Sequence, residues 1–173
     1  MKEILFGVTG GIAAYKSATI VSRLTQQGIC VQVVMTRSAA KLVMPHTFEA
    51  LSGRPVHSAV FDDRRRHAHI ELARSADMFC IAPATANILA KAAHGIADDL
   101  VSTLILSFDK TILFAPAMNT TMWNKPSVQR NIKQLREDGM DFIGPESGNL
   151  SCGEAGIGRM AEPDDIVEKI LSL

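Results

Sequence analysis

The chain has 173 residues, 47% of them hydrophobic, which suits one domain with a sizeable core spanning residues 1–173. It carries 18 Lys and Arg against 18 Asp and Glu, so its charge gives no reason to expect nucleic acid or an anionic membrane as a partner. No apolar run approaches the ~20 residues of a membrane span, and residues 1–5 enter an apolar strand directly, which predicts no signal peptide.

Apolar runs of strand length alternate with stretches of helical periodicity along the chain. The predicted strands are residues 3–8, 30–35, 77–82, 111–115 and 141–143. The predicted helices are residues 13–27, 38–43, 45–51, 69–73, 84–97, 98–107, 126–138 and 163–171. This alternation is typical of a single-domain α/β fold, a doubly wound parallel sheet of the Rossmann or flavodoxin type.

Two segments stand apart from the regular alternation. Pro83 follows the third apolar run, and we expect it to end that strand because proline lacks a backbone donor. Residues 144–161 form a glycine-rich stretch that predicts a long loop. Loops of that length are usually functional or disordered.

A glycine-rich turn follows the first predicted strand, in the sequence Gly-Val-Thr-Gly-Gly-Ile-Ala at residues 7–13. Such a turn points backbone N–H groups and the positive end of a helix at an anion. The spacing is not Gly-x-Gly-x-x-Gly, so the dinucleotide fingerprint is absent, and Thr9, Gly10 and Gly11 suit a single phosphate instead. Thr36 and Ser38 offer further hydroxyls after the second strand, although a tight turn needing glycine for backbone reasons alone stays open.

A second turn of the same kind follows the third strand and opens a helix. Because the carboxyl ends of parallel strands share one edge of a sheet, two such turns favour one shared ligand. The alternative is that Thr85 simply caps the helix. The residues of this turn are Pro83, Ala84, Thr85, Ala86 and Asn87.

The octet Pro-Ala-Met-Asn-Thr-Thr-Met-Trp at residues 116–123 follows the fourth strand. It contains the only Trp of the chain, two Met and one Asn, and it is poor in ordinary turn residues. We expect a site here at which a planar or apolar ligand meets one amide, that of Asn119, which can bond a carboxylate, with Ala117 among the residues expected to bind the ligand.

His67 and His69 follow a run of three arginines at residues 64–66. A histidine can act as a base at neutral pH without a large pKa shift, but a polar run of this kind is ordinarily a solvated loop. The neighbouring residues lack the spacing of a zinc site, so we expect no metal. The residues alone leave open whether His69 is catalytic.

The chain has three cysteines, an odd number without the spacing of a disulfide scaffold, which favours a reducing cytoplasm. Cys30 and Cys80 lie in predicted strands and are expected to be inert core residues. Cys152 lies among glycines and is a candidate reactive thiol. The alternative is an incidental cysteine in a disordered connector.

Taken together, these motifs resemble the homo-oligomeric flavin-containing cysteine decarboxylases, which include phosphopantothenoylcysteine decarboxylase and the lantibiotic peptidyl-cysteine decarboxylases. The resemblance covers residues 1 to about 163, with the motifs in the order of the family. They are the glycine-rich turn, His-Ile-Glu-Leu, Pro-Ala-Thr-Ala-Asn, Gly-Ile-Ala-Asp-Asp-Leu, Pro-Ala-Met-Asn-x-x-Met-Trp, and Cys-Gly followed by Gly-Arg-Met.

The resemblance implies that FMN is the cofactor, with its phosphate near Gly10 and Ser38 and its ring near residues 83–87. It implies that His69 is the catalytic base, that Asn119 binds the substrate carboxylate and that Met122 shapes the wall beside the flavin. Cys152 would be the acid of the reductive half-reaction. The lantibiotic branch lacks that cysteine, so Cys152 favours the small-molecule substrate.

The implied reaction is decarboxylation of 4'-phosphopantothenoylcysteine to 4'-phosphopantetheine in coenzyme A biosynthesis, by a homotrimer or a dodecamer of trimers. The family oxidises the thiol side of the substrate to a thioaldehyde, so that the C=S group accepts the electrons released with carbon dioxide. The alternatives are a peptidyl-cysteine decarboxylase, a flavin prenyltransferase and a non-catalytic regulatory flavoprotein. Bacterial members are commonly fused to a phosphopantothenate–cysteine ligase, so this chain is expected to be a stand-alone enzyme or an excised domain.

Overall fold

The structure, a computed structural model, describes residues 2–59, 68–151 and 153–173. Its centre is a parallel sheet of five strands in the order β2-β1-β3-β4-β5. This order is the flavodoxin-like arrangement, in which the chain reverses direction across the sheet between β1 and β3. The predicted fold class is therefore confirmed. The strands are β1 (Glu3–Val8), β2 (Cys30–Met35), β3 (Met78–Ala84), β4 (Thr111–Pro116) and β5 (Asp141–Phe142).

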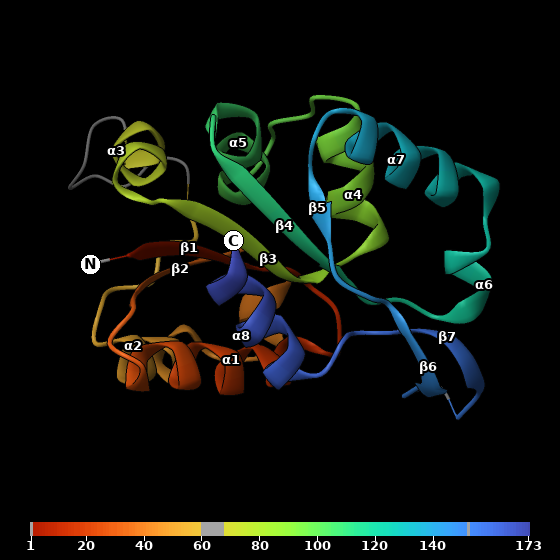
Figure 1. The fold of residues 1–173 in the computed structure, drawn as a ribbon, viewed down its shortest axis with the longest axis horizontal. Coiled ribbons are helices and arrows are strands. Elements are labelled where there is room, and N and C mark those ends of the chain that lie inside the picture. The colour runs from red at the N-terminus through yellow and green to blue at the C-terminus, as the bar shows by residue number, and fades with distance from the viewer. Residues whose placement is uncertain (1, 60–67, 152) are drawn as a thin grey trace.

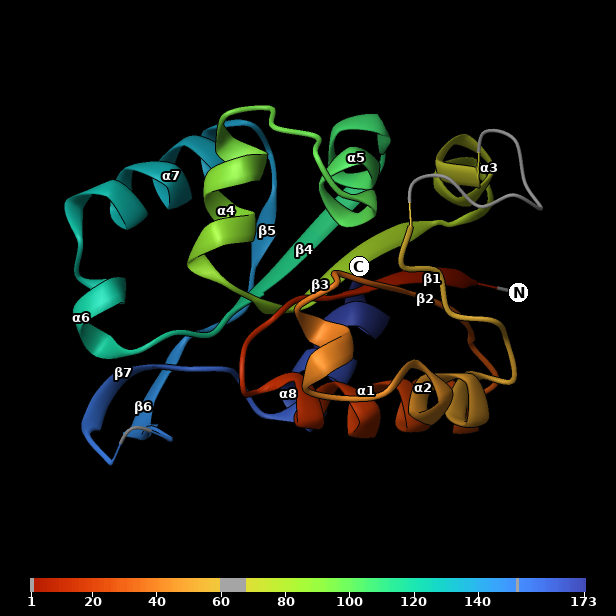
Figure 2. The ribbon, with the colours of Figure 1, turned by 180° about the vertical axis from the view of Figure 1, so that it is seen from behind.

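Helices cover both faces of the sheet, as Figures 1 and 2 show. One face packs against α1 (Ala14–Gln26), α2 (Pro45–Ser52) and α8 (Pro163–Ser172). The other face packs against α3 (Ala68–Ser75), α4 (Ala86–Ala93), α5 (Leu100–Ser107) and α7 (Pro126–Glu137). A 3₁₀ turn, η1 (Ala39–Lys41), follows β2.

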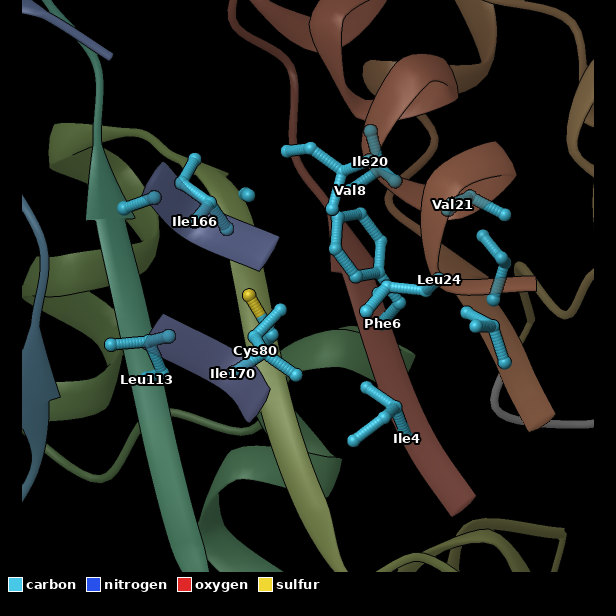
Figure 3. Close-up of a cluster of buried hydrophobic side chains, with 14 of the residues drawn as sticks. Ile4, Phe6, Val8, Ile20, Val21, Leu24, Cys80, Leu113, Ile166 and Ile170 are labelled. Atoms are coloured by element: carbon cyan, nitrogen blue, oxygen red, sulfur yellow. The ribbon is translucent and has the colours of Figure 1, made fainter. Parts of the chain in front are cut away.

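The two layers of core follow from the alternation of side chains along each strand. In β1, Phe6 is fully buried toward α1, where it meets Leu24, whereas Leu5 is fully buried toward the opposite helices. Figure 3 shows the first layer, in which Ile166 and Ile170 of α8 approach the middle strands. Both faces of the sheet are apolar because both carry helices, which explains why the strands are continuous hydrophobic runs.

Strand β3 does not end at Pro83, as its sequence predicted, but continues to Ala84. Its pairing with β4 becomes irregular between Ile81 and Ala84, where the register shifts. The irregularity follows because a proline cannot donate a ladder hydrogen bond. The strand nevertheless continues past Pro83, so that the segment after it begins at Thr85 at the edge of the sheet.

The prediction that residues 144–161 form a loop was wrong in part, because this segment contains an antiparallel hairpin. Strands β6 (Glu146–Asn149) and β7 (Ala155–Arg159) pair with each other and not with the main sheet. Figure 1 shows the hairpin projecting beyond the end of the sheet that lies near α6 (Thr120–Trp123), a short helix that was also not predicted. Glycine is depleted in strands, so the glycine-rich sequence of this segment did not predict the hairpin.

Some predicted residues lie outside the described part of the chain. These are His67 and the arginines at residues 64–66, together with Cys152. In the ranges that are described, no helix combines the length and apolar character needed to cross a bilayer.

Candidate functional site

A cavity of about 480 Å³ lies past the carboxyl ends of β1, β3 and β4. This is the edge of a doubly wound sheet at which ligands bind, beside the crossover between β1 and β3. Four segments form its walls: residues 10–16 at the start of α1, residues 85–86 at the start of α4, residues 117–122 around α6, and the β6–β7 hairpin. The site residues predicted from sequence that line it are Gly10, Gly11, Thr85, Ala86, Ala117, Asn119 and Met122.

The hydroxyl of Thr9 connects the glycine-rich turn at residues 7–13 to the second turn at residues 83–87. It is buried, and its Oγ1 donates to the carbonyl oxygen of Pro83 at 2.7 Å and lies 3.2 Å from Oγ1 of Thr85. The backbone N–H of Thr85 also donates to Thr9 Oγ1. Because the protein itself uses this hydroxyl, Thr9 positions the two turns. The N–H of Gly11 is also used within the first turn, since it donates to the carbonyl oxygen of Thr9 at 2.8 Å.

The turn after β1 lies directly against the loop after β2. A Cβ atom on Gly10 would lie 2.4 Å from Cβ of Ser38, so the two segments approach as closely as they do because residue 10 has no side chain. Ser38 is exposed and does not cap η1; instead Thr36 Oγ1 accepts the N–H of Ala39 at 3.2 Å. The exposed Ser38 hydroxyl is therefore not used as a helix cap and lies beside Gly10.

We predict that Gly10→Ala weakens retention of a bound anion at this turn. The added Cβ would overlap Ser38, so the turn must move by several tenths of an ångström and carry its N–H groups with it. Overpacking of this size typically corresponds to a roughly 5- to 150-fold change. The measurement is the dissociation constant of FMN by fluorescence. Gly11→Ala is the matched control, since its Cβ would meet Thr85 Cγ2 at 3.3 Å and needs a far smaller shift; equal effects in both variants would contradict the prediction.

Helix α1 and helix α4 present different ends to the cavity. No side chain caps the start of α1, and its first turn has no acidic residue, which leaves its positive end available to an anion. In α4, Thr85 Oγ1 accepts the N–H of Ile88, so the capping role weighed as an alternative is present. Asn87 does not face the main cavity but lines a separate groove between α4 and α7.

Asn119 is held in place by the helix that it begins. Its Oδ1 accepts the N–H of Met122 at 2.8 Å, so Asn119 is the N-cap of α6. The carbonyl oxygen of the amide is therefore occupied, and the Nδ2 group is left as a donor on the cavity wall. A donor without a competing acceptor is suited to a carboxylate.

The β6–β7 hairpin forms the outer wall of the cavity. Residues 149–151 at its tip and residues 158–160 at its base line the cavity. The tip is a tight turn, in which Leu150 N–H donates to Glu154 O at 2.8 Å and Gly153 N–H donates to Leu150 O at 3.0 Å. Cys152 belongs to this turn by sequence but lies outside the described residues.

Four charged residues join the base of the hairpin to α1 and α8. Arg159 Nη2 donates to Glu146 Oε2 at 2.9 Å, and its Nη1 lies 3.3 Å from Glu162 Oε1. Lys16 Nζ donates to the same Glu162 oxygen at 3.0 Å. This hydrogen bond to Lys16 is the main reason that the pKa of the Glu162 carboxyl is held below its usual value, with the charge of Arg159 adding to it. The charges compensate one another, so the four residues carry no net charge with which to attract an anion, and partly exposed ion pairs of this kind contribute little to stability.

His69 does not line the cavity, in the part of the chain that the structure describes. It lies on α3, and Figures 1 and 2 show α3 and the β6–β7 hairpin at opposite ends of the molecule. Its Nδ1 is buried and has no hydrogen-bond partner among the described residues. One copy of the chain therefore does not bring His69 together with Asn119.

The two described cysteines lie in strands. Cys80 is fully buried, and burial raises the pKa of its thiol well above the ordinary value, so it is an inert core residue as predicted. Cys30 is only half-buried. No group of three or more His, Cys, Asp or Glu side chains within the described ranges is placed to hold a metal ion.

Several cavity residues were not predicted as site residues. Ile12 in the turn before α1, together with Tyr15 and Lys16 in the first turn of α1, lines the cavity, and Tyr15 is 62% exposed. Their spacing of three and four residues is a helical face, and an exposed aromatic residue on it was the available signal. Arg159 and Met160 fall in a segment that was singled out from the sequence without individual roles.

A flavoprotein family model matches residues 1–173. The chain is 45% identical over 168 residues to the coenzyme A biosynthesis bifunctional protein CoaBC of Vibrio vulnificus (strain YJ016), which covers 96% of this chain and 42% of that protein. The chain thus spans less than half the length of the curated relatives that it matches.

Two solved structures are similar over almost the whole fold. A PPC decarboxylase mutant complexed with pantothenoylaminoethenethiol superposes with a TM-score of 0.86 at 32% identity, covering 99% of this chain and 97% of that one. The FMN-dependent cysteine decarboxylase SpaF has a TM-score of 0.83 at 35% identity, also covering 99% of this chain and 97% of that one.

Proposed function

The chain belongs to the flavoprotein family, and we propose that it is an FMN-dependent decarboxylase that converts 4'-phosphopantothenoylcysteine to 4'-phosphopantetheine. The observation that carries this proposal is the geometry of Asn119, whose amide is fixed as a donor on the wall of the cavity. The similarity to CoaBC proteins and to a PPC decarboxylase supports the same substrate class. A role in coenzyme A biosynthesis follows from that product.

The residues of the cavity fit a flavin mononucleotide. The backbone N–H of Gly10 and the uncapped start of α1, with the hydroxyl of Ser38 beside them, would hold one phosphate, whereas the N–H of Gly11 already donates to Thr9 O. Thr85, Ala86 and Ala117 line the cavity and would flank the ring, whereas Pro83 and Ala84 are buried behind them. Bound FMN would supply the hydride acceptor and donor that make loss of carbon dioxide from this substrate feasible.

The protein would contribute binding, orientation and proton transfer. Asn119 would bond the substrate carboxylate, and Met122, which is 42% exposed beside the cavity, would pack against the reacting end of the substrate. The hairpin would exclude water, and its Cys152 would return a proton to the product. His69 would remove a proton while the substrate is oxidised.

His69 can take this role only if another copy of the chain supplies it, since one copy does not place it at the cavity. We therefore propose a homotrimer, alone or as part of a dodecamer, in which α3 of one copy borders the cavity of the next. An exposed apolar side chain, Ile70, lies beside His69 on α3.

Decarboxylation of a peptidyl cysteine is the second candidate, because the motifs also resemble the lantibiotic peptidyl-cysteine decarboxylases and the similar structure SpaF is an FMN-dependent cysteine decarboxylase. The identity of 45% to CoaBC over most of the chain favours the small-molecule substrate. A purely regulatory flavoprotein would need neither the fixed amide of Asn119 nor His69, so we do not favour it. We further propose that residues 1–173 form one domain that acts in the cytoplasm, where a phosphopantothenate–cysteine ligase is the expected partner.

We expect the purified chain to be yellow, to release FMN, and to convert 4'-phosphopantothenoylcysteine with loss of carbon dioxide. The measurement is mass spectrometry of the product, with a peptide ending in cysteine offered in parallel. If the peptide alone is converted, the result would favour the second candidate function, decarboxylation of a peptidyl cysteine. Colourless protein that does not bind added FMN would overturn the proposal.

A further inference from the structure

Thr9 lies between the two ends of the proposed cofactor site. It directly precedes Gly10, whose N–H would hold the phosphate, and its side chain is buried with 1% exposure. Its Oγ1 donates to Pro83 O at 2.7 Å and accepts the N–H of Thr85 at 3.2 Å. Thr85 lines the cavity where the ring would lie. One side chain therefore connects the backbone at the phosphate end to the backbone at the ring end.

The hydroxyl of Thr9 is engaged within the protein both as a donor and as an acceptor. A threonine hydroxyl has a single proton, and Pro83 O is its nearer acceptor, since Thr85 Oγ1 lies at 3.2 Å. Thr9 is not among the described residues that line the cavity. Any effect of this hydroxyl on a bound cofactor is therefore exerted through the two turns that it connects and not by contact.

The two turns also pack against each other beside this hydroxyl. A Cβ atom on Gly11 would lie 3.3 Å from Thr85 Cγ2, so the glycine-rich turn and the second turn are in close contact. The N–H of Ala117 donates to Ala84 O at 3.1 Å, which attaches the next cavity wall to the same segment. A displacement of the glycine-rich turn is thus transmitted to the residues that would flank the ring, because close-packed groups cannot move independently.

A second buried hydroxyl makes a similar bond without reaching the cavity. Ser17 Oγ, on α1, donates to Ala82 O at 2.7 Å, and Ser17 is fully buried. Thr9 and Ser17 therefore bond to consecutive carbonyl groups near the end of β3. Thr9 differs in that it also accepts the N–H of Thr85, a residue of the cavity wall. Ser17 is thus a matched reference for the loss of a buried hydroxyl as such.

We propose that Thr9 is a positioning residue whose hydroxyl couples binding of a phosphate at Gly10 to binding of a flavin ring at Thr85. The proposal rests on the proposed function for the identity of the cofactor. A phosphate that orders the glycine-rich turn fixes Thr9, and Thr9 in turn fixes the backbone of Thr85 before the ring arrives. Coupling between two binding events is reciprocal, so a bound ring also strengthens the hold on the phosphate.

The test separates the two ends of FMN by using riboflavin and inorganic phosphate as independent probes. The full chain is freed of flavin, and the dissociation constant of riboflavin is measured by its fluorescence with and without saturating phosphate. In wild type, we expect phosphate to tighten riboflavin binding by roughly 5- to 30-fold, the range for one or two buried hydrogen bonds. A riboflavin affinity that does not respond to phosphate would overturn the proposal before any variant is made.

Variants at Thr9 assign the coupling to the hydroxyl. Thr9→Val and Thr9→Ala both remove it, one with a methyl group in its place and one with a small void, and both should lose most of the phosphate effect. Thr9→Ser keeps the hydroxyl and should keep the effect. Ser17→Ala should lower the melting temperature to a similar extent, because it also removes a buried hydrogen bond, but should keep the phosphate effect.

The visible circular dichroism of bound FMN supplies a second readout, because it reports the surroundings of the ring. At saturating FMN, the spectrum should change in Thr9→Val and Thr9→Ala and stay that of wild type in Thr9→Ser and Ser17→Ala. A full phosphate effect in Thr9→Ala, or an equal loss in Ser17→Ala, would overturn the proposal. Wild-type protein that does not bind FMN contradicts the proposed function instead.

Discussion

His69→Asn should abolish reduction of the bound flavin by substrate and leave the flavin in place. The side chain is expected to be the base of the oxidative half-reaction, and loss of a general base typically lowers the rate about 10²- to 10⁴-fold. FMN should be retained because the contacts proposed for its phosphate and ring, at Gly10, Ser38 and residues 85–86 and 117, do not include His69. The measurement is the loss of flavin absorbance on anaerobic addition of 4'-phosphopantothenoylcysteine.

Oligomers that contain two different inactive variants test whether one site uses residues from two copies of the chain. Asn119→Asp should also be inactive, because a second carboxylate would repel that of the substrate, but aspartate still caps α6 and preserves the fold. If the site uses His69 of one copy and Asn119 of another, co-expression of the two inactive variants restores intact sites. Random assortment would give about a quarter of wild-type activity per site.

Either variant alone provides the control, since each should stay inactive. Failure of the mixed oligomer to recover activity would contradict a site shared between copies. Normal flavin reduction in His69→Asn would reassign the base, with His67 the next candidate.

The main sheet could be predicted closely from the sequence, since both of its faces are covered by helices. Strands β1 and β2 have the predicted bounds because fully buried strands are continuous apolar runs. Helix α7 begins at Pro126 as expected, and its buried residues Val128, Ile132 and Leu135 have the spacing of one helical face. In these elements, local pattern and tertiary environment agree.

The hairpin and α6 could not be predicted because contacts distant in sequence stabilise them. The hairpin residues Gly156 and Gly158 disfavour a strand, but they allow the close approach to Met118 and Thr120. The role of the Thr9 hydroxyl has the same origin, since its partners lie in the turn after β3, more than 70 residues away along the chain. Sequence alone indicated the residue types of the site but not which of them the protein itself would use.

Cys152→Ser is expected to separate the two halves of the reaction. Ser151, the residue before it, lines the cavity, and the hairpin turn holds Leu150 against Gly153 and Glu154. A thiol at this position, with an ordinary pKa of ~8.5, could protonate the enethiolate left by decarboxylation, whereas a serine hydroxyl is far less acidic. The variant should therefore still release carbon dioxide but form 4'-phosphopantetheine about 10²-fold more slowly or worse.

The product distinguishes this mechanism from its alternatives. Cys152→Ser should accumulate reduced flavin and an enethiol that is two hydrogens lighter than 4'-phosphopantetheine, whereas wild type should end each turnover with oxidised flavin. Ser151→Ala is the matched control, because it alters the same turn without removing the thiol, and it should make the normal product. If wild type itself releases the enethiol, the peptidyl-cysteine type of reaction is favoured and Cys152 is only a residue of the hairpin. Formation of 4'-phosphopantetheine by Cys152→Ser at the wild-type rate would assign the proton to water or to another group, because a serine hydroxyl is too weak an acid to sustain that rate.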